Sequence, residues 1–334
     1  MAILPDFCRT AADSFHSHGQ SLSNPLVEGL VLRIDAKVCH VEVNGRTEKV
    51  ALRGKLFEGR SKEKRPVAVG DRVLLTHNEM GGAIEKVLPR TTKLARKSAG
   101  DDEREQVMAA NISLCLIVSS VREPPFQARL VDRIFAGCER QKLPCALVLT
   151  KMDRARKKDN ADEWIDLYRG LGYTVLPTSI TAGKETEASL AELSELLHSN
   201  MSVLAGLSGV GKSSLLNHLM PELDLRIGSM SKIRQGKHTT SHTQLIPLPG
   251  GGHVLDTPGI RNFGLFGMAP QELTFYYREL ATLVSKCAYR DCSHTVEPDC
   301  AVSAAFEEGT IAASRFESYL EILTDLQAEV DMEN

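Results

Sequence analysis

Short stretches of alternating apolar and polar residues mark the front of the chain. One of them, Val38–Val43, is followed directly by the dipeptide Asn44-Gly45. Asn-Gly between two alternating runs is a strong hairpin signal, and several short strands in one small region favour a barrel. We therefore predict an OB-fold β-barrel over residues 27–100.

Two aperiodic polar segments flank the expected strands, an N-terminal arm at residues 1–26 and a charged linker at residues 89–106. The arm has no apolar run of the kind found in signal peptides. The longest apolar run of the chain, Ile112–Val118, is too short to span a bilayer. The eight cysteines of such a chain are expected to be reduced thiols or metal ligands. We expect a cytoplasmic protein that makes no membrane contact.

After residue 110 the pattern changes to strands that alternate with helices. Ile112–Val118 and Cys145–Leu149 are continuous apolar runs of buried-strand length, and Leu130 and Ile134 share one helix face between them. This alternation predicts an α/β domain, a parallel sheet covered by helices, over residues 105–265. The later elements of this domain are expected at Tyr173–Leu176, Leu190–Leu197, Met201–Leu204, Lys212–Met220 and His253–Leu255.

A glycine-rich turn follows the expected strand Met201–Leu204 and leads into the expected helix Lys212–Met220. It fits the motif G-x-x-x-x-G-K-[ST], in which backbone N–H groups turn toward phosphates at a helix start. Lys212 would place its charge at the β- and γ-phosphates, and the Ser213 hydroxyl would ligate Mg²⁺. A chance match to the motif is the alternative. The expected nucleotide contacts of this phosphate loop are Gly206, Leu207, Ser208, Gly209, Val210, Gly211, Lys212, Ser213 and Ser214.

A second nucleotide signal, which we call the base loop, lies upstream at a strand end. Its residues Thr150, Lys151, Met152 and Asp153 resemble the T/N-K-x-D loops that read guanine. The Asp153 carboxylate can accept hydrogen bonds from guanine N1–H and N2–H₂, whereas adenine offers no matching donors. Thr150 has a shorter reach than the usual Asn, so weaker base affinity is expected. Ser179, after the next strand, is similar to the loop that touches guanine O6.

Two switch segments are expected downstream of the phosphate loop. Residues 256–259 read Asp-Thr-Pro-Gly and fit D-x-x-G, in which Asp256 reaches Mg²⁺ through water and the Gly259 N–H senses the γ-phosphate. A simple Pro-Gly turn is the alternative. In the polar segment between the two motifs, Thr239 or Thr240 would complete the Mg²⁺ shell.

The catalytic group is less obvious than the nucleotide ligands. Ile260 stands where Ras-like proteins carry the glutamine that orients the attacking water, so a low intrinsic rate is expected. His238, in the first switch segment, is the candidate that orients water or becomes ordered when a partner binds. A solvated or structural histidine is the alternative.

The last part of the chain, residues 266–334, is predicted to be helical and to hold a structural metal. Its spacing Cys-x4-Cys-x-His-x5-Cys offers three thiolates and one imidazole, a complete tetrahedral set for Zn²⁺ with no open position. Four unrelated residues are the alternative. The expected zinc ligands are Cys287, Cys292, His294 and Cys300.

Charge is distributed unevenly along the chain, although the formal net charge is only −3. Residues 27–100 carry 16 Lys and Arg against 9 Asp and Glu, whereas residues 264–334 carry 4 against 13. The basic front could meet a phosphate backbone, and a solvated charged surface is the alternative.

The order of the loops is a cyclic permutation of the usual GTPase order, because the base loop and Ser179 precede the phosphate loop and the two switches. With a barrel in front and a Cys₃His cluster behind, this order closely resembles the RsgA/YjeQ-type GTPases of small ribosomal subunit biogenesis. The resemblance covers about residues 27–325 and includes G-x-H-T-T at 236–240 and D-T-P-G at 256–259. Thr150 in place of Asn is the departure.

The resemblance implies a monomeric GTPase that the 30S subunit stimulates late in its assembly, with contacts from the barrel and the zinc domain to 16S rRNA. It would leave the subunit when GTP is hydrolysed to GDP. Because the second switch leads directly into the zinc domain, γ-phosphate sensing at Gly259 is hypothesised to reorient that domain. The alternatives are another P-loop NTPase, such as an ATPase or small-molecule kinase, and a nucleotide-switched zinc and RNA-binding module with little turnover.

Overall fold

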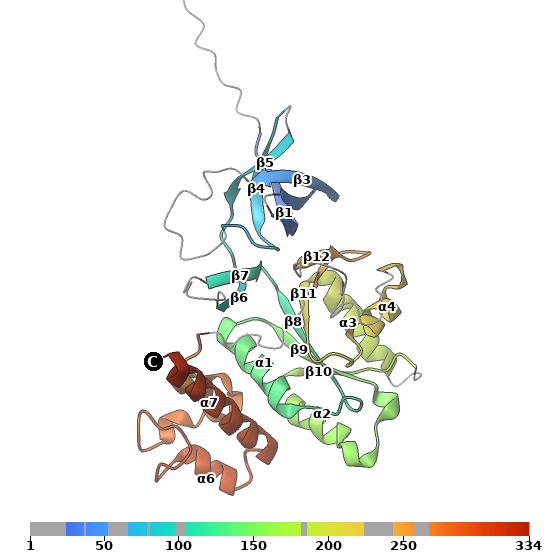
Figure 1. The fold of residues 1–334 in the computed structure, drawn as a ribbon. Coiled ribbons are helices and arrows are strands. Elements are labelled where there is room, and N and C mark those ends of the chain that lie inside the picture. The colour runs from blue at the N-terminus through green and yellow to red at the C-terminus, as the bar shows by residue number, and fades with distance from the viewer. Residues whose placement is uncertain are drawn as a thin grey trace, which may run out of the picture.

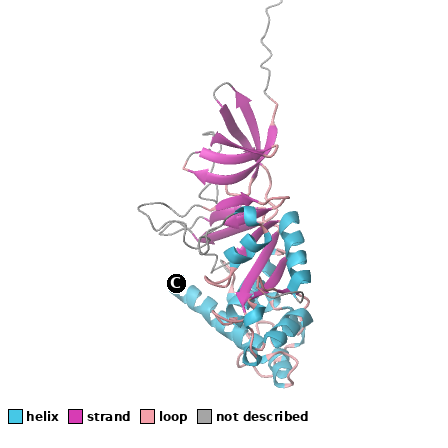
Figure 2. Cartoon of the chain, turned by 90° about the vertical axis from the view of Figure 1, so that its right-hand side faces the viewer, coloured by secondary structure: helices cyan, strands magenta, loops and turns pink. Residues whose placement is uncertain are grey.

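The fold was analysed in a computed structural model (Figure 1). The structure describes residues 25–36, 38–52, 66–78, 81–97, 105–181, 186–223, 243–256 and 267–333. A small all-β part lies at one end, a mixed α/β part in the middle and a helical part at the other end (Figures 1 and 2).

The all-β part is a closed five-stranded barrel, as the alternating pattern predicts. Its strands are β1 (Val27–Asp35), β2 (Val38–Val43), β3 (Arg46–Leu52), β4 (Arg72–Asn78) and β5 (Gly81–Val87). They follow the order β1-β2-β3-β5-β4, and β4 pairs back to β1 to close the barrel. The pair β3–β5 is parallel and the others are antiparallel. Inward-facing residues such as Val41, Val50 and Ile84 fill its core.

The expected linker at residues 89–106 is wrong in part, because residues 93–97 and 105–106 belong to a two-stranded antiparallel ribbon. This ribbon pairs β6 (Lys93–Lys97) with β7 (Glu105–Ala110). Leu94, Val107 and Ala109 are buried and pack the ribbon onto the neighbouring core. Only these few apolar positions stand among many charges, so the period-two pattern is too sparse to see in the sequence.

The middle part is the predicted α/β domain. Its strands β8 (Leu114–Ser120), β9 (Cys145–Thr150), β10 (Thr174–Pro177), β11 (Met201–Ala205), β12 (Gln244–Pro247) and β13 (His253–Asp256) lie in the order β10-β9-β8-β11-β13-β12. All neighbours are parallel except the edge pair β12–β13. The helices of this domain are α1 (Ala128–Gln141), α2 (Ala161–Gly170), α3 (Glu187–Ser199) and α4 (Lys212–Leu219).

Strand β8 shows why the central strands are continuously apolar. All seven of its residues are buried. Cys115 and Ile117 face one hydrophobic core with Ile134 of α1, whereas Leu116 and Val118 face the second core on the other side of the sheet. A parallel strand covered by helices on both faces has no solvent side to display polar residues.

The helical part packs against α1 of the α/β domain. It contains α5 (Arg278–Ala281), α6 (Ala301–Glu307) and α7 (Ala313–Glu333), preceded by a 3₁₀ helix at Pro270–Tyr276. In Figure 1, α7 runs beside α1, and Ala136 of α1 belongs to the core of the helical part. The expectation of a helical C-terminal part is met by these elements, of which α7 extends to Glu333.

A buried ion pair joins the helical part to α1. Arg315 of α7 is 1% exposed and donates to Asp132 of α1, which is fully buried. Asp132 also accepts a 2.7 Å hydrogen bond from the Tyr168 hydroxyl, and Arg315 Nε donates to Glu279 Oε1 at 2.6 Å. The guanidinium lies 4.3 Å from the centre of the Tyr277 ring. A charge this deeply buried requires its partner, so separating the helical part from α1 would leave Asp132 or Arg315 uncompensated.

Candidate nucleotide-binding site and metal cluster

The phosphate loop lies between the end of β11 and the start of α4. Gly206, Gly209 and Gly211 have φ values of 148°, 84° and 103°, which side chains rarely adopt. A Cβ on Gly206 would also lie 2.0 Å from the Val118 carbonyl oxygen, so glycine is required there. Lys212 Nζ donates to the carbonyl oxygens of Gly206 (2.9 Å) and Leu207 (2.7 Å), which holds its ammonium over the loop. The N–H groups at a helix start such as that of α4 suit a phosphate.

The base loop is tied directly to the phosphate loop. Thr150 ends β9, is 5% exposed and donates from Oγ1 to the Val210 carbonyl oxygen at 2.6 Å. Lys151, with φ of 61°, donates from Nζ to the Gly209 carbonyl oxygen at 2.8 Å. The Thr150 side chain thus connects the base loop to the phosphate loop. The weak contact with the base that its short side chain leads us to expect stays a prediction.

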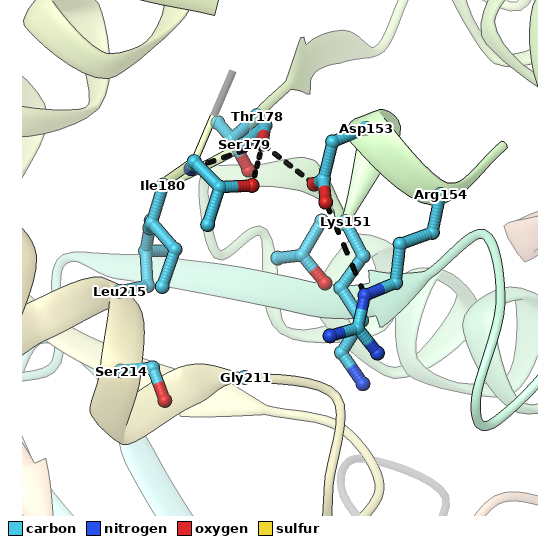
Figure 3. A pocket seen from close by; sticks show the side chains of 11 residues that line it. Lys151, Asp153, Arg154, Thr178, Ser179, Ile180, Gly211, Ser214 and Leu215 are labelled. Atoms are coloured by element: carbon cyan, nitrogen blue, oxygen red, sulfur yellow. Dashed lines mark hydrogen bonds and ion pairs between the residues drawn. The ribbon is translucent and has the colours of Figure 1, made fainter.

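Asp153 and Ser179 meet in one pocket, as their expected roles require (Figure 3). Ser179 Oγ donates to Asp153 Oδ1 at 2.6 Å, and this bond is the main reason that the pKa of Asp153 is lowered. The cavity has a volume of about 170 Å³. An ionised carboxylate in it can accept two donors from the edge of a base, whereas Ile180 and Leu215 supply an apolar wall for a ring face.

Two oxygen groups that could face Mg²⁺ come from neighbouring strand ends. Ser213 opens α4 after β11 and is 7% exposed, and Asp256 ends β13 and is 8% exposed. Burial raises the pKa of Asp256, and a hydrogen bond from Gln244 opposes that shift. A carboxylate and a hydroxyl that come from neighbouring strand ends are oxygen donors of the kind that Mg²⁺ accepts, completed by phosphate and water.

The remaining site residues expected from the sequence lie outside the residues that the structure describes. They are His238, Thr239, Thr240, Gly259 and Ile260. The catalytic and γ-phosphate-sensing roles of this group therefore stay predictions.

A segment after β8 also takes part in the site, although its residues are not among the expected contacts. The Glu123 carbonyl oxygen accepts a hydrogen bond from Lys151 Nζ, and Glu123 Oε2 accepts one from Arg154 at 3.1 Å. Pro124 Cδ lies 3.9 Å from the Cβ position of Gly209. The signal for this segment was its position, because it follows a buried parallel strand at the edge where ligands bind.

The four expected zinc ligands converge at the base of the helical part, and their ligand atoms all lie within 4.8 Å of one another. Cys287 Sγ is 4.0 Å from Cys300 Sγ and 3.6 Å from His294 Nδ1, which is 3.3 Å from Cys300 Sγ. Zn–S bonds of about 2.3 Å in a tetrahedron place sulfurs about 3.8 Å apart, so the spacing and the donor set fit zinc. Burial lowers the pKa of His294, which favours the neutral imidazole that binds metals.

The loop within this cluster is held by Glu297. Its carboxylate accepts hydrogen bonds from the Ser293 N–H and hydroxyl and from the Thr295 and Val296 N–H groups, at 2.6 to 3.2 Å. Partial burial would raise the pKa of Glu297, but these bonds outweigh it and hold the pKa at about 2. The carboxylate therefore fixes the turn that carries His294 toward the other ligands.

Among the described residues, no helix combines the length and apolar character that crossing a membrane requires.

Comparison with known proteins identifies the family. A family model described as RsgA GTPase matches residues 87–266. The small ribosomal subunit biogenesis GTPase RsgA of Chlorobaculum parvum is 42% identical over 270 residues, which cover 78% of this chain and 85% of that protein. The protein of the same name from Bacteroides fragilis is 33% identical over 305 residues and covers 90% of this chain and 97% of its own.

Solved structures show the same architecture. The crystal structure of YjeQ from Thermotoga maritima has a TM-score of 0.73 and 33% identity, and the match covers 91% of this chain and 99% of that one. YloQ, described as a circularly permuted GTPase, has a TM-score of 0.69 and 27% identity, with 95% and 99% covered. The loop order, the site and these matches together show that the chain belongs to the RsgA family of circularly permuted, GTP-hydrolysing enzymes.

Proposed function

We propose that this GTPase acts in the late assembly of the small ribosomal subunit and that the 30S particle stimulates its GTP hydrolysis. The observation that carries the nucleotide part is the connection of Asp153, through the Thr150–Val210 hydrogen bond, to the phosphate loop. Relatives with most of this chain's length are named for small-subunit biogenesis, which supports the ribosomal part.

In this proposal each loop has one task. Asp153 and Ser179 read guanine, the N–H groups of residues 206–214 hold the phosphates, and Lys212 stabilises charge that develops on them. When bound, Mg²⁺ would neutralise the β- and γ-phosphate oxygens, with Ser213, Asp256 and Thr239 or Thr240 as its protein-side partners. Gly259 would sense the γ-phosphate.

We assign the orientation of the attacking water to His238. The test is GTP hydrolysis by His238→Ala, alone and with added 30S subunits, with His218→Ala as the matched control because His218 lies exposed on α4. Stimulated turnover is expected to fall in the first variant and stay unchanged in the second. An unchanged stimulated rate in His238→Ala would show that the histidine has no catalytic role. A parent enzyme whose GTP hydrolysis does not increase when 30S subunits are added would contradict the proposed function itself.

We assign 16S rRNA contact to the barrel and the zinc domain, with Zn²⁺ as the structural metal of the Cys₃His cluster. Lys and Arg exceed Asp and Glu by 16 to 9 over residues 27–100, and a basic OB-fold suits a nucleic-acid backbone. Arg46 and Lys49 are exposed on β3. The double substitution to Glu is expected to weaken 30S binding, whereas Lys158→Glu, exposed in the GTPase domain, serves as the control.

The domain division follows the same proposal: an arm at 1–26, the barrel at 27–100, the GTPase domain at 105–265 and the zinc domain at 266–334. The protein would act as a cytoplasmic monomer. Binding of 30S subunits with a non-hydrolysable GTP analogue and with GDP tests the coupling between the second switch and the zinc domain. Equal affinities would rule that coupling out.

A further inference from the structure

The edge strand β12 is shared between the GTPase sheet and the barrel. Gln244 lies opposite Asp256 of β13 on one side and opposite Arg33 of β1 on the other. Both pairs are antiparallel, so directly opposite side chains project from the same face with Cβ atoms about 5 Å apart. Asp256, Gln244 and Arg33 therefore form a cross-strand row that spans the joint between the two domains.

Each end of this row is held by further polar contacts. At the GTPase end, cross-strand pairing places the Gln244 amide where it can donate to the Asp256 carboxylate, and this interaction opposes the rise in the pKa of Asp256 that burial causes. At the barrel end, Arg33 Nε donates to Asp35 Oδ2 at 3.0 Å, and His40 Nε2 lies 3.0 Å from the same oxygen. His40 is also the residue opposite Arg33 on β2. The register thus places Gln244 between the Asp256 carboxylate on one side and the Arg33 contacts of the barrel on the other.

We propose that Gln244 is a positioning residue for the Mg²⁺-side carboxylate of Asp256, and that the pairing of its strand with β1 makes that position depend on the barrel. An amide donor can fix one carboxylate oxygen and leave the other directed at the cation, and it adds no charge that would compete with a cation. Asp256 is 8% exposed, so little water is available to take the place of this donor.

The position of Gln244 along the chain supports the second half of the proposal. Gln244 is the first residue of β12, and the segment expected to form the first switch, residues 236–242, ends two residues before it. Pairing with β1 anchors the strand where that segment returns to the sheet. A displacement of the Gln244 side chain by Asp256 would move β12 and pass from there to β1 through the main-chain pairing of the two strands.

The first test measures Mg²⁺ rather than turnover. Affinity for a fluorescent GDP analogue is titrated against Mg²⁺ and measured in its absence for the parent, for Gln244→Leu and for Ile246→Leu. Ile246 lies on the same strand and face but opposite Val254, which makes it the matched control. In Gln244→Leu the half-saturating Mg²⁺ concentration should rise about tenfold, because a hydrogen bond to a charged group is lost. Mg²⁺-free affinity should stay unchanged.

The outcomes separate this inference from the proposed magnesium site on which it rests. An unchanged Mg²⁺ requirement in Gln244→Leu, or equal losses with and without Mg²⁺, would overturn the positioning role. If the nucleotide affinity of the parent protein is the same with and without Mg²⁺, the proposed magnesium site is wrong, and the positioning role is wrong with it.

The second test addresses the barrel. Backbone amide exchange over β1 is compared between the Mg²⁺ complexes of GDP and of a non-hydrolysable GTP analogue. Protection of residues 31–34 should differ between the two states in the parent and in Ile246→Leu, and the difference should vanish in Gln244→Leu. The β2–β3 hairpin, which does not pair with β12, provides the internal reference. Identical β1 protection in the two states of the parent would overturn the dependence on the barrel.

Discussion

The Thr150 hydroxyl donates to the Val210 carbonyl oxygen at 2.6 Å, across sixty residues of chain. Thr150 ends the strand that leads into the loop of Asp153, which we propose reads guanine, and Val210 lies in the proposed phosphate loop. A shorter side chain than the usual Asn therefore still connects the two halves of the nucleotide site. Substitution of Thr150 can therefore test whether this contact contributes to nucleotide affinity.

Thr150→Val keeps the shape of the side chain and removes the donor, so a buried carbonyl oxygen is left without its partner. We expect affinity for both GTP and GDP to fall by about 1–2 kcal/mol, roughly five- to thirtyfold. Titration with a fluorescent GDP analogue measures it. Thr174→Val, at an exposed position of β10, should leave affinity at the parent level. Similar small effects of both substitutions would show that the contact contributes nothing.

Asp153→Asn replaces an acceptor pair with a group that also donates. Guanine then loses its hydrogen bonds to a charged acceptor, and GTP affinity should fall by at least about a hundredfold. Xanthine carries a carbonyl where guanine carries its amine, so XTP should bind the variant better than GTP does. Competition between the two nucleotides measures the reversal, and Asp162→Asn, exposed on α2, is the control. A variant that still prefers GTP would remove Asp153 from base recognition.

Cys292→Ser removes one ligand of the metal cluster. We expect bound zinc to fall from about one equivalent per chain to a small fraction, because a structural site holds its ion with four ligands. Metal analysis after dialysis measures the loss, and thermal unfolding should show a destabilised C-terminal domain. Cys145→Ser, a half-buried cysteine far from the cluster in sequence, should retain zinc. Full zinc content in Cys292→Ser would contradict the assignment.

Arg315→Met leaves Asp132 buried without its cation. The expected cost is about 3–5 kcal/mol of unfolding free energy. Urea unfolding followed by the fluorescence of Trp164, the single tryptophan, reports on the α2 side of this interface. Arg129→Gln offers a matched control, because Arg129 pairs with Asp325 across the same helices but is 46% exposed. That change should cost less than about 1 kcal/mol. Equal costs for the two variants would mean that burial of the pair adds no stability.

Much of the fold could be predicted because its signals are local. Strands buried on both faces, such as β8, read as continuous apolar runs, and the phosphate loop is recognisable from its glycines and lysine. The Cys₃His spacing likewise lies within one short segment. These features depend on neighbours in sequence, which is what periodicity and motifs record.

The rest depends on partners far apart in the chain. Strand β12 has four residues, of which only Leu245 is buried, so it leaves almost no hydrophobic pattern. The partner of Thr150 and the partner of Arg315 are set by how distant elements pack, and no local pattern reports either one. No local pattern reports the role of Gln244 either, because that role depends on Arg33 and Asp256 in the strands on its two sides.

The pairing of Arg33 with Gln244 also sets an order for synthesis. The barrel strands are complete once residue 87 has left the ribosome, whereas the strand that β1 meets in the GTPase domain begins at residue 244. N-terminal units fold first during translation, so the barrel can form well before its docking edge exists. The Arg33 end of β1 must then wait without its β12 partner until most of the chain is made. A newly made molecule would therefore acquire its interdomain joint as one of its last folding steps.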